Sequence, residues 1–312
     1  MAAIAAEGVV MRSVGALYRV RLPEGQLIEA TLRGKLRLQG LKTTNPVAVG
    51  DRVELLSEGG TWVIAAVAER HNFIARKAVK ASSQVQILCA NVDQALMVAS
   101  LKEPFTALGY IDRFLVMCEA YHVPAVVVFN KTDLLESEKE LGRLDDFAFI
   151  YEQAGYPVYP VSALAATHQA EVLALLKDKV SFLAGPSGAG KSSLINLVDP
   201  TLQLRTGVIS THTLKGRHTT TFAEMYPLAF GGYVIDAPGF REFDLVNIGP
   251  EELGGYFPEF RKLMPGCQFN NCLHTHEPNC AVRAAVEREL LADTRYHTYL
   301  GMLGALQAEQ QK

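Results

Sequence analysis

The sequence predicts a multidomain α/β protein, because three parts of the chain differ in their patterns of polar and apolar residues. Residues 9–70 carry short runs of alternating polar and apolar residues between the turn signals PEG, VGD and EGG, which is typical of a small antiparallel barrel. From about residue 82, apolar strand-like runs alternate with helical patterns, which indicates a parallel sheet covered on both faces. After about residue 243 a Cys/His cluster precedes a helical tail. We expect three domains, at 1–72, 73–242 and 243–312.

Particular runs of sequence define the expected elements within these domains. The barrel strands are expected at 16–22, 26–35, 51–56 and 61–67. In the central domain, strands are expected at 94–100, 123–129, 157–163, 180–185 and 231–236, with helices at 111–122 and 171–180. Residues 281–306 form the expected helical tail.

Size and charge limit the classes of protein. A chain of 312 residues with 49% hydrophobic residues can fill two or three domain cores. Its first residues, MAAIAAEGVVM, lack the features of a signal peptide, and VPAVVVF is too short to span a bilayer, so we expect a cytoplasmic protein. Residues 1–80 contain twelve Lys and Arg against seven Asp and Glu, whereas the whole chain has a net charge of −3. The N-terminal part therefore favours polyanions, although a solvated face without a ligand would have the same charge.

A glycine-rich segment predicts a phosphate-binding loop. The pattern Gly185-x4-Gly190-Lys191-Ser192 follows the apolar run VSFLA and precedes the helix-like SSLINLV. Backbone N–H groups and the helix N-terminus can hold phosphate oxygens, Lys191 can reach the β- and γ-phosphates, and Ser192 can ligate Mg²⁺. The expected loop consists of Gly185, Pro186, Ser187, Gly188, Ala189, Gly190, Lys191, Ser192 and Ser193.

Two further loops predict recognition of guanine. The tetrad Asn130-Lys131-Thr132-Asp133 follows VPAVVVF and therefore lies at the carboxyl end of a strand, where ligands bind in such sheets. A single carboxylate can accept both the N1–H and the N2 amino group of guanine, and adenine offers no such pair. The stem of Lys131 can lie on the base, while Asn130 can tie this loop to the phosphate loop. Ser162 and Ala163 follow PVYPV and are expected at the guanine O6.

Two segments are expected near the γ-phosphate. Asp236-Ala237-Pro238-Gly239 follows the strand GGYVI, with Asp236 placed for Mg²⁺ and the Gly239 amide placed for the phosphate. Residues 207–222 are polar, as in a loop that orders around nucleotide, and an ordinary exposed loop would look the same. Thr219 or Thr220 is expected to ligate Mg²⁺ beside Ser192. The sequence does not decide between them, and we assign Thr220 as the Mg²⁺ ligand.

The order of these motifs indicates a circular permutation. The chain runs from the base loop through Ser162 to the phosphate loop, the threonine loop and Asp236, whereas an ordinary GTPase begins at the phosphate loop. Both orders are one circle opened at different points, and joining the old ends preserves every loop around the nucleotide. The sequence therefore predicts a circularly permuted P-loop GTPase domain.

A Cys/His cluster predicts a structural zinc site. Its spacing is Cys267-x4-Cys272-x-His274-x5-Cys280, and three thiolates with one imidazole make a closed tetrahedral Zn²⁺ site. A disulfide would leave one thiol unpaired and is disfavoured in a reducing cytosol. Spacing alone does not exclude His276 as the fourth ligand.

Several of these features together resemble the RsgA (YjeQ) family of bacterial small-ribosomal-subunit biogenesis GTPases. They are the permuted order, GRHTTT at 216–221, DAPGFREF at 236–243, the barrel and the Cys/His cluster, and the resemblance covers nearly the whole chain. It implies an OB-fold that contacts 16S rRNA, a C-terminal zinc domain with His274 as ligand, and a factor acting late in 30S maturation. We expect a monomer, although the sequence itself does not show the oligomeric state. GTP would promote binding to the 30S subunit, and hydrolysis would promote release.

The sequence departs from ordinary GTPases at the position that orients the attacking water. Phe240 stands where Ras-like proteins have Gln, and its ring cannot position water. His218 is our hypothesis for the replacement, since the family gives the matching His that role; a solvated loop histidine is the alternative. A P-loop kinase is disfavoured by NKTD and DAPG. An RNA-binding module with an inactive nucleotide site is disfavoured by Lys191, Ser192 and Asp236.

Overall fold

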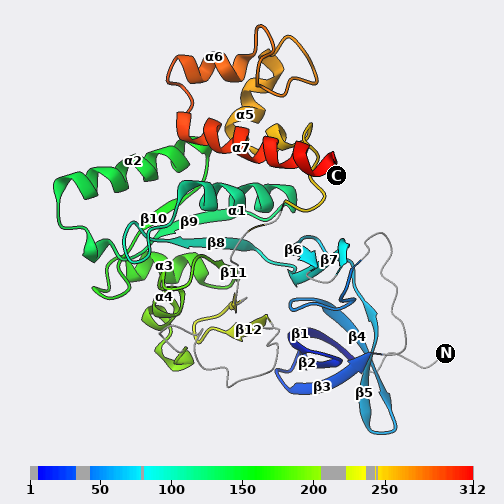
Figure 1. Cartoon of the computed structure of the whole chain (residues 1–312). Coiled ribbons are helices and arrows are strands. Elements are labelled where there is room, and N and C mark those ends of the chain that lie inside the picture. Colours follow the sequence, from blue (N-terminus) through cyan, green and yellow to red (C-terminus); the bar gives the residue numbers. More distant parts are fainter. Residues whose placement is uncertain are drawn as a thin grey trace, which may run out of the picture.

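The computed structural model describes residues 6–32, 43–78, 81–204, 223–236, 243 and 245–311. An N-terminal barrel is built from β1 (Ala6–Val14), β2 (Leu17–Arg21), β3 (Leu27–Leu32), β4 (Arg52–Glu58) and β5 (Thr61–Val67). Their hydrogen-bonded order is β1-β2-β3-β5-β4, and β4 pairs with β1, so the sheet closes on itself (Figure 1). The alternation seen in the sequence sends Val10, Val20, Leu55 and Ile64 inside. The sequence predicted an antiparallel barrel, but one pair of strands, β3 and β5, is parallel.

A hairpin that the sequence analysis did not identify connects the barrel to the central domain. It consists of β6 (Phe73–Ala78) and β7 (Ala81–Ala90), which pair antiparallel. Isolated bridges from Thr43 to Val85 and from Val49 to Cys89 connect β7 to the segment that precedes β4. The barrel also contacts the central sheet through β1 and β12 (Glu224–Pro227), where Arg12 lies opposite Glu224.

The central domain has the expected mostly parallel sheet. Its strands are β8 (Gln94–Ala99), β9 (Ala125–Phe129), β10 (Val158–Pro160), β11 (Val180–Ala184), β12 and β13 (Tyr233–Asp236). The spatial order is β10-β9-β8-β11-β13-β12, and only β12 runs antiparallel to its neighbour within this domain. The carboxyl ends of β9, β10, β11 and β13 therefore meet at one edge, where ligands bind in such sheets.

Helices cover both faces of this sheet (Figure 1). On one face, α1 (Leu108–Ala120) and α2 (Glu138–Ala154) bury Phe114, Leu115 and Tyr151. On the other face, α3 (Gln169–Leu176) and α4 (Lys191–Val198) bury Leu176 and Leu194. Two short 3₁₀ turns, η1 (Thr132–Leu134) and η2 (Pro200–Leu202), follow β9 and α4. Alternate residues of β8 belong to the two cores, as burial on both sides requires.

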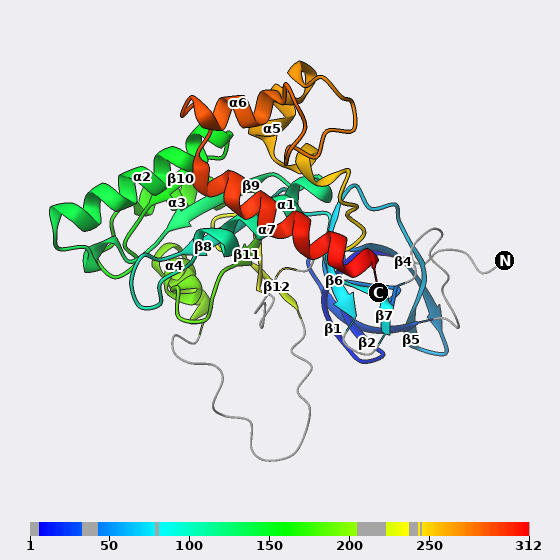
Figure 2. The ribbon, with the colours of Figure 1, turned by 45° about the horizontal axis from the view of Figure 1, so that its top comes forward.

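The C-terminal region is helical and packs on α1. It comprises η3 (Leu253–Tyr256), α5 (Pro258–Leu263), η4 (Met264–Gly266), α6 (Ala281–Glu287) and α7 (Asp293–Gln310). The expected continuous tail is thus two helices, separated where Glu289 adopts a left-handed conformation with φ of 58°. Figure 2 shows α7 running across α1 toward β6 and β7, and Lys77 of β6 makes a 2.7 Å ion pair with Glu309 of α7.

Buried charges join this region to the central domain. Arg295 of α7 is 2% exposed and its guanidinium lies 2.7 Å from both Asp112 of α1 and Glu259 of α5. Tyr151 of α2 donates to Asp112 at 3.1 Å, so four helices, α1, α2, α5 and α7, share one polar cluster. Burial raises the pKa of Asp112, and the adjacent Arg295 opposes that shift. Among the described residues, no helix is long and apolar enough to cross a membrane.

Candidate functional site

The phosphate loop lies between β11 and α4, in the strand, loop and helix context that the motif needs. Gly185 and Gly190 have φ of 141° and 93°, which side chains rarely adopt. A Cβ on Gly185 would lie 2.1 Å from the Val98 carbonyl oxygen, and one on Gly190 would lie 2.1 Å from Asn130 Nδ2. The glycines are therefore required both by the turn and by the close approach of β8 and the base loop.

Lys191 and Asp236 form the charged centre of this loop. Lys191 Nζ donates to the carbonyl oxygens of Gly185 at 2.8 Å and Pro186 at 3.0 Å. Burial lowers the pKa of Lys191, and the Asp236 carboxylate opposes that shift. Burial conversely raises the pKa of Asp236, opposed by Lys191. The two groups thus stabilise each other's charge beside the phosphate loop.

A magnesium ion fits the oxygen groups at this position. Asp236 Oδ1 is buried and has no hydrogen-bond partner among the described residues. Ser192, in the first turn of α4, supplies a half-buried hydroxyl. Carboxylate and hydroxyl oxygens suit Mg²⁺, which in nucleotide sites takes one or two protein ligands together with phosphate oxygens.

Asn130 connects three of the loops that the sequence predicted around the nucleotide. Its side chain is 3% exposed. The amide Nδ2 donates to the Ala189 carbonyl of the phosphate loop at 2.9 Å, and Oδ1 accepts from the Ala163 amide at 3.0 Å. The tie to the phosphate loop was expected from the sequence, and the tie to the loop after β10 was not. One buried amide thereby fixes the spacing between the base loop and the phosphate loop.

The remaining residues of the base loop, Lys131 to Asp133, are half-buried or exposed. Lys131 has φ of 66°, and its ammonium donates to the Glu103 carbonyl. The Ser162 hydroxyl donates to Asp133 Oδ1, and Ala165 N–H donates to the Ser162 hydroxyl at 2.9 Å. Thr132 N–H donates to the Val161 carbonyl at 3.2 Å, which holds η1 against β10. The structure therefore brings Lys131, Asp133 and Ser162 together beside the phosphate loop.

The other predicted nucleotide residues lie outside the described residues. These are His218, Thr219, Thr220 and Gly239, and Phe240 also lies there. Their roles stay predictions from the sequence.

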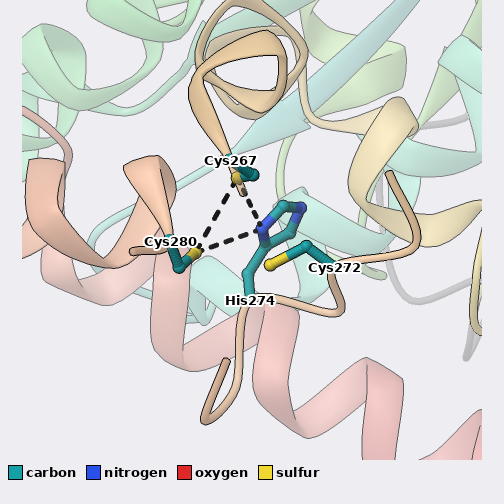
Figure 3. A group of neighbouring side chains, drawn as sticks. All are labelled: Cys267, Cys272, His274 and Cys280. Atoms are coloured by element: carbon teal, nitrogen blue, oxygen red, sulfur yellow. Dashed lines mark hydrogen bonds between the residues drawn. The ribbon is translucent and has the colours of Figure 1, made fainter. Parts of the chain in front are cut away.

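A second site brings together Cys267, Cys272, His274 and Cys280 (Figure 3). One ligand atom from each residue lies within 4.8 Å of all the others, with His274 Nδ1 3.4 Å from Cys280 Sγ and 3.7 Å from Cys267 Sγ. Cys267 follows η4 and Cys280 caps α6, so the site ties two short helices together. All five cysteines of the chain are free thiols.

Burial favours the neutral forms of the ligand groups at this second site. Burial raises the pKa of Cys272 to about 12 and lowers the pKa of His274. Each thiol releases its proton when it binds a metal, whereas a neutral imidazole binds through the lone pair of its unprotonated nitrogen, and three thiolates with one imidazole suit Zn²⁺. His276 is exposed and its Nδ1 lies 2.9 Å from Thr275 Oγ1, outside the cluster.

Backbone contacts around the cluster hold its loop in place. Tyr296 and Tyr299 of α7 donate to the carbonyls of His274 and Leu273, each at 2.7 Å. Glu277 is the centre of the loop: burial would raise its pKa, but donation from the Leu273, Thr275 and His276 amides lowers it to about 2. The loop is thus anchored to α7, whose Arg295 contacts α1.

Sequence reasoning missed the residues that support these sites. Lys102 and Glu103 follow β8 and contact the base loop, while Arg295 and Asp112 join the domains. The local signal for Asp112 was its charge within the largely apolar helix pattern expected at 111–122. Nothing local pointed to its partner 183 residues away.

The fold and the nucleotide site define a circularly permuted P-loop GTPase. The base, Ser162, phosphate and Asp236 loops follow β9, β10, β11 and β13 in that order along the chain, around one sheet edge. The family model described as "RsgA GTPase" matches residues 67–246, and the one described as "RsgA N-terminal domain" matches residues 7–61. The chain belongs to the RsgA GTPase family, as its motifs predicted.

Curated relatives and solved structures agree over nearly the whole chain. "Small ribosomal subunit biogenesis GTPase RsgA" of Bacteroides fragilis is 44% identical over 298 residues, covering 95% of this chain and 96% of the relative. The protein of the same name from Porphyromonas gingivalis is 43% identical, covering 97% and 98%. YjeQ from Thermotoga maritima superposes with a TM-score of 0.78 at 37% identity, covering 96% of this chain and 98% of YjeQ. YloQ, described as a circularly permuted GTPase, has a TM-score of 0.74 at 29% identity, covering 97% and 96%.

These matches confirm the predicted fold class. The chain has an N-terminal OB-like barrel, a circularly permuted GTPase domain and a Cys₃His cluster near its C-terminus. It is a GTPase, and by homology a GTPase of small-ribosomal-subunit biogenesis.

Proposed function

We propose that this GTPase is an assembly factor for late maturation of the 30S subunit, binding 16S rRNA with GTP and leaving after hydrolysis to GDP and phosphate. The names of its curated relatives support the small subunit as partner. The observation that carries the nucleotide part is Asn130, whose buried amide joins the base loop to the phosphate loop. We further propose that the protein works as a cytoplasmic monomer.

Each predicted nucleotide residue has a role in this proposal. Lys131 and Asp133 read guanine, and Ser162 orients the Asp133 carboxylate while the backbone of the loop that contains Ser162 and Ala163 lies at O6. Residues 185–193 cradle the phosphates, with Lys191 balancing their charge. Ser192, Thr220 and Asp236 hold Mg²⁺ directly or through water, and Thr219 and Gly239 contact the γ-phosphate. When bound, Mg²⁺ supplies positive charge to the transferred phosphoryl group.

Catalysis requires a group that positions water, since Phe240 cannot. We propose His218, with slow hydrolysis by the free protein and faster hydrolysis on the 30S subunit. We expect His218→Ala to bind GTP normally and to lose most of the stimulated rate, because general acid–base assistance by a positioned side chain typically contributes about 10²–10⁴-fold. Single-turnover hydrolysis with 30S subunits measures this. A stimulated rate equal to that of the unmodified protein would overturn the assignment.

The three proposed domains divide the work. The barrel, in residues 1–72, exposes Arg19 and Arg52 on its strands and belongs to the positively charged part of the chain, which suits rRNA phosphates. Residues 73–242 bind and hydrolyse GTP. Residues 243–312 form a zinc domain, in which Cys267, Cys272, His274 and Cys280 hold one structural Zn²⁺ and leave no position open for substrate.

Two histidines of the zinc loop make a matched test of the metal site. We expect His274→Ala to lower the zinc content from about one ion per chain to well below half, because a closed site loses one of four ligands. His276→Ala, two residues away and exposed, should keep its zinc. Inductively coupled plasma mass spectrometry on gel-filtered protein measures the ratio. Full zinc in His274→Ala, or its loss in His276→Ala, would contradict the ligand set.

Co-sedimentation tests the proposed partner. The protein is centrifuged with separated 30S and 50S subunits in the presence of GDP or a non-hydrolysable GTP analogue. We expect it to pellet with 30S in the analogue and to be released in GDP. Binding only to 50S would overturn the partner and leave the GTPase assignment intact.

A further inference from the structure

The segment between β8 and α1, residues 100–106, lies between the base loop and the phosphate loop. A Cβ on Gly188 of the phosphate loop would be 3.3 Å from Pro104 Cδ, and the Glu103 carbonyl accepts from the Lys131 ammonium of the base loop. The segment closes on itself, because Ser100 and Thr106 exchange two hydrogen bonds of 3.0 and 2.8 Å. Its shape is therefore fixed while it touches both nucleotide loops.

Lys102 fastens this segment to the chain that follows the base loop. Its Nζ donates to the Leu134 carbonyl at 2.9 Å, at the end of η1, the turn that carries Asp133. The same ammonium lies 2.6 Å from Glu140 Oε1, in the first turn of α2. One side chain thus holds both the base-reading turn and the helix behind it.

Glu140 is itself fixed by the start of α2. Its carboxylate accepts from the amides of Glu136 at 3.0 Å and Ser137 at 3.2 Å, and the Ser137 hydroxyl accepts from the Glu140 amide in a capping box. Donation from Lys102, followed by these amides, lowers the pKa of Glu140 to about 2. The partner of Lys102 is therefore ionised and oriented at working pH.

This arrangement prepares the base loop before nucleotide arrives. Lys131 is a non-glycine residue with φ of 66°, a conformation that local sequence does not favour and that surrounding contacts must maintain. With its ammonium on the Glu103 carbonyl, the Lys131 stem is held beside the phosphate loop. Groups ordered in advance lose less conformational freedom on binding, and affinity rises accordingly.

We propose that Lys102 is a positioning residue for guanine nucleotides, holding residues 100–106 against the base loop so that Lys131 and Asp133 are aligned for the base. This inference rests on the proposed reading of guanine by the base loop. Lys102 lies outside the GTPase motifs. In this proposal it contributes to the affinity for the nucleoside part of the ligand and does not contribute to the affinity for phosphates.

Lys102→Met tests this role. Lys139→Met is the control, because it removes an exposed lysine from the first turn of α2, next to Glu140. We expect Lys102→Met to weaken GDP binding about fivefold, as loss of a partly exposed ion pair allows, with faster GDP dissociation. Binding of inorganic pyrophosphate should stay unchanged, because that ligand contacts the phosphate loop alone. Lys102→Arg should restore most of the GDP affinity, and Lys139→Met should match the unmodified protein.

The outcomes separate this inference from the proposed function. Fluorescent GDP with ADP and pyrophosphate as competitors gives all the affinities. If the unmodified protein prefers GDP to ADP and Lys102→Met leaves GDP binding intact, the positioning role is wrong. An equal loss for GDP and pyrophosphate would show general damage to the site and would also overturn it. If the unmodified protein binds ADP as tightly as GDP, the proposed guanine reading itself fails.

Discussion

Replacing Arg295 by Ala is expected to lower the free energy of unfolding by about 3–5 kcal/mol, because removing one partner of a buried ion pair leaves uncompensated charge. Arg295 is 2% exposed and lies 2.7 Å from Asp112 and from Glu259. Its guanidinium also stacks over Phe257, 4.7 Å from the ring centroid. The substitution thus removes charge pairing and packing at the junction of α1, α5 and α7. Urea denaturation monitored by circular dichroism measures the loss.

Arg261→Ala is the matched control for this prediction. Arg261 of α5 also pairs across the domain junction, with Glu119 of α1 at 3.1 Å, but its side chain is 58% exposed. Exposed pairs contribute about 0–1 kcal/mol, so this variant should unfold almost like the unmodified protein. The combined variant Arg295→Met, Asp112→Asn and Glu259→Gln should recover part of the lost stability, since no charge is then left unpaired. Equal stabilities of Arg295→Ala and Arg261→Ala would contradict the account.

The buried cluster also explains how the C-terminal region is held near the nucleotide site. Asp112 lies on α1, which begins directly after residues 100–106 and their contacts to the base loop. Phe243, at the end of the DAPGFREF stretch, packs on the same helix, with ring centroids 4.8 Å from Tyr110 and 5.2 Å from Phe114. Helix α1 therefore follows directly on residues 100–106 and contacts both Phe243 and the zinc-bearing region.

The nucleotide loops could be predicted from sequence because their chemistry is local. A phosphate loop needs glycines at fixed spacing, and Gly185 and Gly190 adopt the backbone conformations that explain them. The cluster of Cys267, Cys272, His274 and Cys280 was equally visible, since its ligands fall within fourteen residues. Periodicity identified the parallel sheet, because strands buried on both faces are continuously apolar.

The features that were missed depend on pairing between distant parts of the chain. The parallel pairing of β3 with β5 and the hairpin of β6 and β7 follow from how strands meet in space, which alternation alone does not encode. The sequence around Lys102 and around Arg295 does not distinguish them from other charged residues, because their partners lie 38 and 183 residues away. Such long side chains acquire a role only when the tertiary structure brings an acceptor within reach.

Asp133→Asn is expected to exchange the preferred base from guanine to xanthine. Guanine offers N1–H and an amino group, and the Asn oxygen can accept from only one of them, so the loss of one hydrogen bond to a charged group, about 1.5–3 kcal/mol, corresponds to about a 10- to 100-fold loss of GDP affinity. Xanthine carries a carbonyl in place of the amino group. The Asn amide can donate to that carbonyl while its oxygen accepts from N1–H. Xanthosine diphosphate should therefore bind this variant better than GDP.

The surrounding contacts make this substitution selective for base reading. Asp133 Oδ1 accepts from the Ser162 hydroxyl, and an Asn side chain keeps an oxygen that can do the same. Asn130, which fixes the loop spacing, is untouched. Asp146→Asn, at an exposed position of α2, is the control and should leave both affinities unchanged. Competition of GDP and xanthosine diphosphate against a fluorescent nucleotide gives the ratio for each variant. If Asp133→Asn still prefers GDP, the base is read elsewhere, and the role of the loop reduces to the structural tie made by Asn130.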